Sequence, residues 1–134
     1  MTENFKNLRF IIDSSAWIEY FNGTEKGKNA LKIIEKKENE IMTLDVCAAE
    51  IKFWALNQKK DFRQMQVIIR ANSSVIETNS ENWLKAAEIK FEKRKEKKNF
   101  GFVDALIIVK SFDLKAGIVT TDQHFKNEKH SILL

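Results

Sequence analysis

The sequence contains no proline and only one cysteine, Cys47, among its 134 residues. A single cysteine excludes a disulfide within the chain and a zinc site built from several thiolates. A reducing cytoplasm is therefore the expected location. The lack of proline, together with abundant Lys, Glu and Ile, is typical of ion-pair-rich proteins from hot environments.

Long apolar runs are also missing. The apolar stretch 105–109 stops at Lys110, well short of the roughly 20 residues that a membrane-spanning helix needs. The first residues, Met1 to Asn7, are polar and interrupted by charge, and they lack the apolar core of a signal peptide. We therefore expect no membrane segment and no membrane partner.

The composition of the chain is typical of one folded domain. Hydrophobic residues make up 43% and charged residues 31%, which excludes intrinsic disorder. A chain of this length can bury a core without cross-links, so we expect a single domain over residues 1–134. Lys and Arg number 23 against 19 for Asp and Glu, giving a formal net charge of +4. This small excess is compatible with a polyanionic partner such as a nucleic acid.

The first apolar run ends on an acid. Residues 9–12 predict a buried strand, and Trp17, Ile18 and Phe21 then recur at helical spacing. Asp13 thus lies where strand turns into helix, a corner that faces the ligand crevice in a parallel sheet. Taken alone, Asp13 is more simply explained as the cap of the helix. The same chemistry recurs later in the chain, which favours a site.

The order of strand, acid and helix is repeated. A strand at 41–44 precedes Asp45 and a helix at 46–58, and a strand at 118–121 precedes Asp122. Further strands are expected at 74–77 and 131–133, and further helices at 62–70, 81–98 and 102–112. This alternation predicts a three-layer α/β/α fold with a mainly parallel five-stranded sheet. In the strand order 3-2-1-4-5, Asp13 and Asp122 flank the switch point of the sheet.

Two further carboxylates lie on apolar helix faces. Glu50 shares its face with Val46 and Trp54, so it must lie near an opening, pair with a cation or bind a metal. A salt bridge to a distant Lys or Arg explains Glu50 equally well. Asp104 lies in the first turn of its helix, where the helix dipole is a sufficient reason for an acid. The stripe that continues to Ile107 is nevertheless apolar and is expected to face the sheet.

The expected helix 81–98 has an apolar first half and a basic second half. Leu84, Ala87 and Phe91 are spaced for the core. A solvated helix face is the usual explanation for such a charge run, and the alternative is a rim that contacts RNA phosphates. The basic residues that this alternative assigns to the rim are Lys93, Arg94, Lys95, Lys97 and Lys98.

The predicted fold brings four acids together: Asp13, Glu50, Asp104 and Asp122. Several carboxylates within a few ångströms repel one another, so they need cations to neutralise them. Oxygen ligands without a His or Cys cluster point to Mg²⁺ or Mn²⁺ rather than to zinc. His124 is isolated in the sequence, and we assign it to a surface turn beside Asp122.

Four segments with these acids resemble a known family. They are 12–15 (IDSS), 48–51 (AAEI), 101–107 (GFVDALI) and 119–125 (VTTDQHF). In order and spacing they are similar to PIN-domain ribonucleases, most of all to VapC-type toxins. The resemblance implies that Asp13, Glu50, Asp104 and Asp122 bind divalent metal for RNA hydrolysis. It implies a supporting role for Ser15 and Thr120, whose alternative explanation is ordinary turn chemistry.

The resemblance also implies partners. VapC-type toxins pair with a small VapB-like antitoxin that covers the site, and they usually form homodimers through helices. Trp54, Phe62 and Met65 could supply such surfaces, although core packing is the default for each of them. The implied reaction is hydrolysis of an RNA phosphodiester bond without a nucleophilic side chain, with Mg²⁺ or Mn²⁺ as cofactor.

Other functions predict different residues. A haloacid-dehalogenase-like phosphatase needs a second Asp two residues after the first, and Ser15 occupies that place. A catalytically silent PIN-fold module that only binds RNA or protein predicts missing acids, and none is missing. A PIN nuclease of RNA processing, outside a toxin-antitoxin pair, stays open as an alternative.

Overall fold

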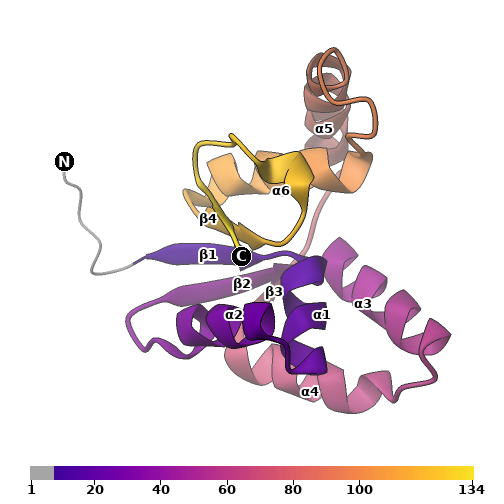
Figure 1. Cartoon of the computed structure of the whole chain (residues 1–134). Coiled ribbons are helices and arrows are strands. Elements are labelled where there is room, and N and C mark those ends of the chain that lie inside the picture. The colour runs from indigo at the N-terminus through magenta and orange to yellow at the C-terminus, as the bar shows by residue number, and fades with distance from the viewer. Residues whose placement is uncertain (1–7) are drawn as a thin grey trace.

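The computed structural model describes residues 8–134, which form a five-stranded sheet with helices on both faces (Figure 1). The strands are β1 (Arg9–Ile12), β2 (Glu40–Leu44), β3 (Ser74–Ile76), β4 (Gly117–Thr120) and β5 (Ser131–Leu133). All neighbouring strands are parallel, in the order β3-β2-β1-β4-β5. The predicted fold class and strand order are therefore confirmed. The expectation about Met1 to Asn7 lies outside the described residues.

The helices alternate with the strands along the chain. They are α1 (Ser14–Asn22), α2 (Glu25–Glu35), α3 (Asp45–Asn57), α4 (Phe62–Asn72), α5 (Ser80–Lys93) and α6 (Phe102–Leu114), followed by the 3₁₀ turn η1 (Gln123–Phe125). In Figure 1, α6 and α5 lie on one side of the sheet, and α1, α2 and α4 lie on the other. Within residues 8–134, no helix has the length and apolar character needed to span a membrane.

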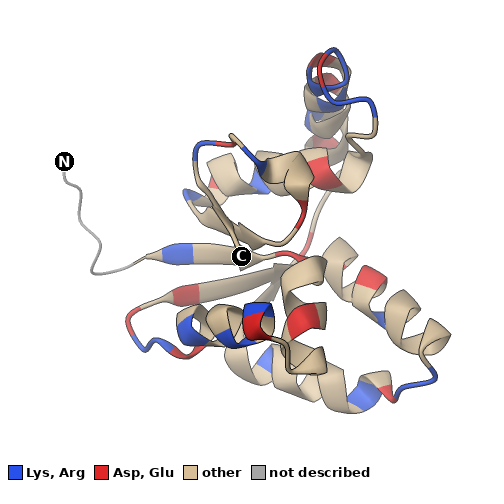
Figure 2. Ribbon diagram, in the orientation of Figure 1, with Lys and Arg blue, Asp and Glu red and all other residues tan. Residues whose placement is uncertain are grey.

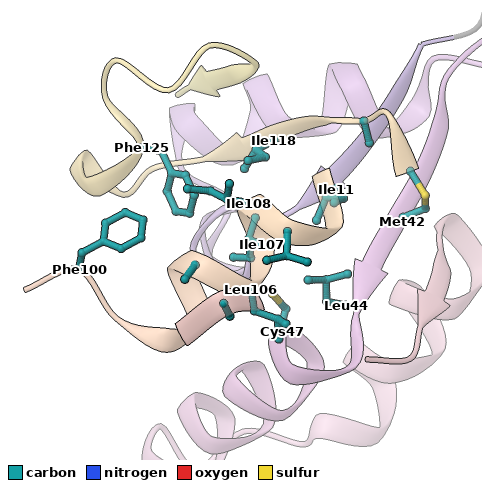
Figure 3. Packing of buried hydrophobic residues seen from close by; sticks show 14 residues of the cluster. Ile11, Met42, Leu44, Cys47, Phe100, Leu106, Ile107, Ile108, Ile118 and Phe125 are labelled. Carbon is teal, nitrogen blue, oxygen red and sulfur yellow. The ribbon is translucent and has the colours of Figure 1, made fainter. Parts of the chain in front are cut away.

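Each face of the sheet has its own core. Successive strand residues point to opposite faces, so Ile11 of β1 packs under α6 while Phe10 and Ile12 pack against the other helices. Figure 3 shows the first core, in which Ile11 lies near Ile107 of α6. Trp17 of α1 is fully buried in the second core. The two cores hold the carboxyl ends of the central strands in fixed positions.

The structure corrects the prediction for the long helix. The helix ends at Lys93, so most of the predicted basic half lies in the connection to α6. Leu84 and Phe91 are 63% and 68% exposed, and Ala87 is also exposed, whereas Ala86 is buried against α6. The helix carries two apolar stripes, and packing against α6 selects the one that contains Ala86.

The apolar residues named for partner surfaces belong mainly to the core. Met65 is buried, and Trp54 and Phe62 are partly buried against the second core, as the default explanation predicts. The exposed apolar side chains of this region are instead Phe53 and Leu56 on α3 and Val67 on α4. In this region, the exposed apolar surface therefore lies on α3 and α4.

Candidate metal centre

Asp13 follows β1 and is both the cap of α1 and a buried carboxylate. Its Oδ1 accepts the Ser14 backbone N–H at 2.8 Å, and its Oδ2 accepts the hydroxyls of Ser15 at 3.1 Å and Thr120 at 2.8 Å. Only 5% of Asp13 is exposed. Burial raises the pKa of Asp13 above its ordinary value of 3.8, although these hydrogen bonds lower it in part. The capping explanation is therefore confirmed for Asp13, and its role in a site stays a prediction.

Ser15 and Thr120 tie the start of α1 to the end of β4. Their hydroxyls lie 3.2 Å apart, and each also accepts a backbone N–H at 3.0 Å: Ser15 from Thr121 and Thr120 from Asp122. The two hydroxyls thus orient Asp13 and hold the chain just before Asp122. This arrangement gives them a physical means to support a site at Asp13.

Glu50 projects from α3 toward Asp13. The Ser14 hydroxyl donates to Glu50 Oε1 at 2.8 Å. Burial raises the pKa of Glu50 above its ordinary value of 4.5, and the charges of Asp13, Asp104 and Asp122 raise it further. The alternative of a salt bridge is not found: between residues 8 and 134, no Lys or Arg lies within ion-pairing distance of Glu50.

Asp104 and Asp122 meet at a histidine that the sequence analysis assigned to a surface turn. Asp104 Oδ2 accepts the Gly101 N–H at 3.0 Å and lies 2.9 Å from Nδ1 of His124. Asp122 caps η1 by accepting the His124 N–H at 2.9 Å, and its Oδ1 lies 3.5 Å from the same Nδ1. Local sequence patterns do not indicate this contact, because the link between His124 and Asp104 exists only in the folded chain.

The four acids lie at the carboxyl ends of the central strands and on the adjoining helices. In Figure 2, red acidic segments gather where the end of β1, the start of α6 and α3 approach one another. The possible ligand atoms form two sets, and within each set all atoms lie within 4.8 Å of one another. The first set comes from Asp13, Cys47 and Glu50. The second set contains Asp104, Asp122 and His124.

The donor atoms of this centre fit a hard divalent cation. Cys47 Sγ lies 3.9 Å from Asp13 Oδ1, but burial, with the charges of Asp13 and Glu50, raises the pKa of this thiol well above 9.0. A protonated thiol is a poor ligand, so the Asp13 side offers mainly oxygen, as Mg²⁺ and Mn²⁺ prefer. Among the residues that the structure describes, no Lys or Arg ion pair neutralises the four carboxylates.

Several of the predicted rim residues have partners inside the fold. The Arg94 guanidinium donates to the Phe100 carbonyl at 2.9 Å, and the Lys97 ammonium donates to the His124 carbonyl at 2.7 Å and to the Lys126 carbonyl at 3.1 Å. Lys93 pairs with Glu128, while Lys95 pairs with Glu92 on the surface. These contacts hold η1 against the connection between α5 and α6.

A parallel sheet with carboxylates clustered at its switch point defines an α/β domain of the kind that holds a hard cation. A family model described as PIN domain matches residues 10–129. The chain belongs to the PIN-domain family.

Solved structures with the same fold include toxin-antitoxin proteins. VapBC2 from Rickettsia felis, bound to a DNA fragment from its promoter, is 18% identical with a TM-score of 0.72, covering 95% of this chain and 98% of that chain. VapC20 from Mycobacterium tuberculosis, a toxin that cleaves the sarcin-ricin loop, is 16% identical with a TM-score of 0.71, covering 90% and 95%. A toxin-antitoxin complex from Klebsiella pneumoniae is 19% identical with a TM-score of 0.64, covering 91% and 94%. No curated protein sequence matches the chain.

Proposed function

We propose that this protein is a divalent-metal-dependent endoribonuclease, the toxin of a VapBC-like type II toxin-antitoxin pair. The observation that carries the proposal is the convergence of Asp13, Glu50, Asp104 and Asp122 without a Lys or Arg counter-ion among the described residues. Such a cluster is costly for the fold alone, and a bound cation relieves its repulsion. Membership of the PIN-domain family supports a nuclease.

The four acids share one role in the proposed reaction, which is to hold the metal ion. Asp13 and Asp104 would hold Mg²⁺ or Mn²⁺, with help from Glu50 and Asp122. The bound ion supplies Lewis acidity toward the phosphate and an activated water for the hydrolysis. Burial keeps bulk water away from Asp13, which strengthens its attraction for a cation.

Ser15 and Thr120 would act through Asp13 rather than on the substrate. Their hydroxyls both donate to Asp13 Oδ2. They thereby fix the direction in which the free lone pairs of that carboxylate point.

The partners follow from the same proposal. The fold is shared with several VapBC structures, two of which contain DNA. We propose a VapB-like antitoxin as partner, RNA as substrate and the cytoplasm as location. The exposed apolar stripe of α5, formed by Leu84, Ala87 and Phe91, offers a surface for a homodimer.

The basic run contributes less to the proposed RNA contact than its charge indicates. Lys93, Arg94 and Lys97 are engaged within the fold, whereas the pair of Lys95 with Glu92 is exposed. Lys95 and Lys98 are the members of the rim that we propose for contact with RNA phosphates.

The decisive experiment is cleavage of a panel of structured RNAs by the purified protein with Mg²⁺, with Mn²⁺ and with EDTA. Wild type should cleave only with metal, and Asp13→Asn and Asp104→Asn should lose at least about a hundredfold in rate, because Lewis-acid catalysis contributes several kcal/mol. Asp113→Asn, at the exposed far end of α6, is the matched control and should retain activity. Cleavage that survives EDTA, or a folded and fully active Asp13→Asn protein, would contradict the proposal.

The cleavage assay, together with a growth assay after expression in a host cell, separates the alternative functions. A catalytically silent module would bind RNA or a partner protein and cleave nothing under any metal. A nuclease of RNA processing would cleave the panel, yet its expression would not inhibit the growth of a host cell. Growth arrest that depends on Asp13 supports the toxin.

A further inference from the structure

His124 lies within ligand distance of two of the four acids. Its Nδ1 is 2.9 Å from Asp104 Oδ2 and 3.5 Å from Asp122 Oδ1. The side chain is 31% exposed, so solutes can reach it. The chain has one other histidine, His130. It is exposed, and its carbonyl accepts the backbone N–H of Ile118 in β4.

We propose that His124 is a nitrogen ligand of the metal centre, and that it makes the Asp104 side of the centre prefer Mn²⁺ to Mg²⁺. This inference rests on the proposed function, because it specifies which ion that function uses. Imidazole binds first-row transition ions well, whereas Mg²⁺ prefers oxygen ligands. The Asp13 side of the centre offers mainly oxygen and carries no such preference.

The separations of these atoms suit a shared ion. Ligand atoms at about 2.1 Å from an ion, at adjacent corners of an octahedron, lie about 3.0 Å apart. The distance from His124 Nδ1 to Asp104 Oδ2, 2.9 Å, is close to this value. Asp122 Oδ1, at 3.5 Å, lies slightly beyond it and within the span of the second set of ligand atoms.

The fold positions the imidazole from several directions. The backbone N–H of His124 donates to Asp122, and its carbonyl accepts from Lys97. The ring centroid lies 5.9 Å from that of Phe100, and the next residue, Phe125, is buried in the first core. A ring held at its backbone and beside a buried aromatic loses little freedom when it binds an ion.

The competing explanation is that His124 only donates a hydrogen bond that orients Asp104. That role would affect metal binding in general, without a preference between ions and without a bond from nitrogen to the metal. The two explanations therefore differ in a spectroscopic signal and in a ratio of affinities.

The test is pulsed electron paramagnetic resonance of Mn²⁺ bound to the full chain. We expect a nitrogen coupling in the wild type and in His130→Asn, and its loss in His124→Asn. Labelling all histidine with ¹⁵N should change the coupling in the wild type, which keeps the test valid even if His124→Asn does not fold. By calorimetry, the preference for Mn²⁺ over Mg²⁺ should fall at least about tenfold in His124→Asn.

The outcomes also separate this inference from the proposed function. Bound Mn²⁺ without nitrogen coupling in the wild type, or an unchanged preference in a folded His124→Asn protein, would overturn the role of His124 alone. A wild-type protein that binds neither Mn²⁺ nor Mg²⁺ would instead overturn the proposed function.

Discussion

At the scale of single residues, Asp13 combines two functions that usually fall to different side chains. It caps α1 with one oxygen, and with the other it accepts two hydroxyl hydrogen bonds at the base of the acidic cluster. These bonds reduce the cost of burying the carboxylate but do not remove it, because the pKa of Asp13 is still raised. Without a bound metal, the buried Asp13 carboxylate therefore lowers the free energy of unfolding.

This cost predicts a pH-dependent effect of Asp13→Asn. The folded state raises the pKa of Asp13, so the contribution of this group to stability is complete below about pH 4 and is lost as the pH rises through the folded pKa. Asparagine does not titrate. In EDTA, the melting temperature of Asp13→Asn relative to wild type should therefore increase between about pH 4 and pH 8.

Thermal unfolding followed by circular dichroism measures this difference. Asp113→Asn is the control, because Asp113 is exposed and lies outside the cluster. A difference in melting temperature between Asp13→Asn and wild type that stays constant over this pH range would contradict the raised pKa of Asp13.

At the scale of elements, close packing of α1 and α2 positions the second core. A Cβ added at Gly27 of α2 would lie 2.1 Å from the Glu19 carbonyl oxygen and 2.8 Å from the Tyr20 Cα, both backbone atoms of α1. These backbone atoms cannot move aside as a side chain can. The absence of a side chain at Gly27 thus allows α2 to approach α1.

We predict that Gly27→Ala costs about 2–3 kcal/mol of unfolding free energy, since overpacking against backbone forces the helices apart. Gly101→Ala is the matched control: its added Cβ meets nothing closer than Asp104 Oδ2 at 3.8 Å, so the cost should stay below about 1 kcal/mol. Chemical denaturation gives both values. Equal losses would contradict the packing argument.

Lys97 connects two other elements. Its ammonium joins the segment after α5 to the carbonyls of His124 and Lys126, and Glu128 Oε2 lies 3.5 Å away. Lys97→Ala should cost about 1–3 kcal/mol of stability, because it leaves these acceptors without their charged donor. Lys95→Ala removes the exposed pair with Glu92 and the contact of the ammonium with the Phe91 ring, 5.2 Å from its centroid, and should cost less than about 1 kcal/mol.

Thermal melts and RNA-binding measurements distinguish the two possible functions of Lys97. A loss of stability, as predicted, assigns Lys97 to the support of η1. Unchanged stability with weakened RNA binding would instead assign it to the rim that the sequence analysis predicted.

At the scale of the whole molecule, exposed apolar side chains are concentrated on a few helices. Leu84, Ala87 and Phe91 form a continuous stripe on α5, and Phe102 at the start of α6 lies nearby, with Lys90 4.1 Å from its ring centroid. The exposed apolar residues of α3 are Phe53 and Leu56, and that of α4 is Val67. A continuous apolar stripe is the more favourable surface for association, because it buries more apolar area.

We therefore predict that the protein forms a homodimer through this stripe of α5. Light scattering coupled to size-exclusion chromatography should show a dimer for wild type and a monomer for Leu84→Glu, because a charge at the centre of an interface is costly to bury. Val67→Glu on α4 should remain a dimer. A monomeric wild type, or a dimer that tolerates Leu84→Glu, would contradict this surface.

Local patterns in the sequence predict much of this structure. The alternation of strand, acid and helix correctly predicts a parallel sheet, and it places Asp13 and Asp122 at strand ends. These features depend on residues close together in the chain, whose periodicity and capping chemistry act before the fold is complete.

Only the tertiary structure decides the remaining features. It selects which apolar stripe of α5 is buried, engages Lys97 with η1, and brings His124 of η1 to Asp104 of α6. Each of these contacts joins segments that are distant in sequence. Their partners are chosen by the packing of whole helices on the sheet, which no local periodicity specifies.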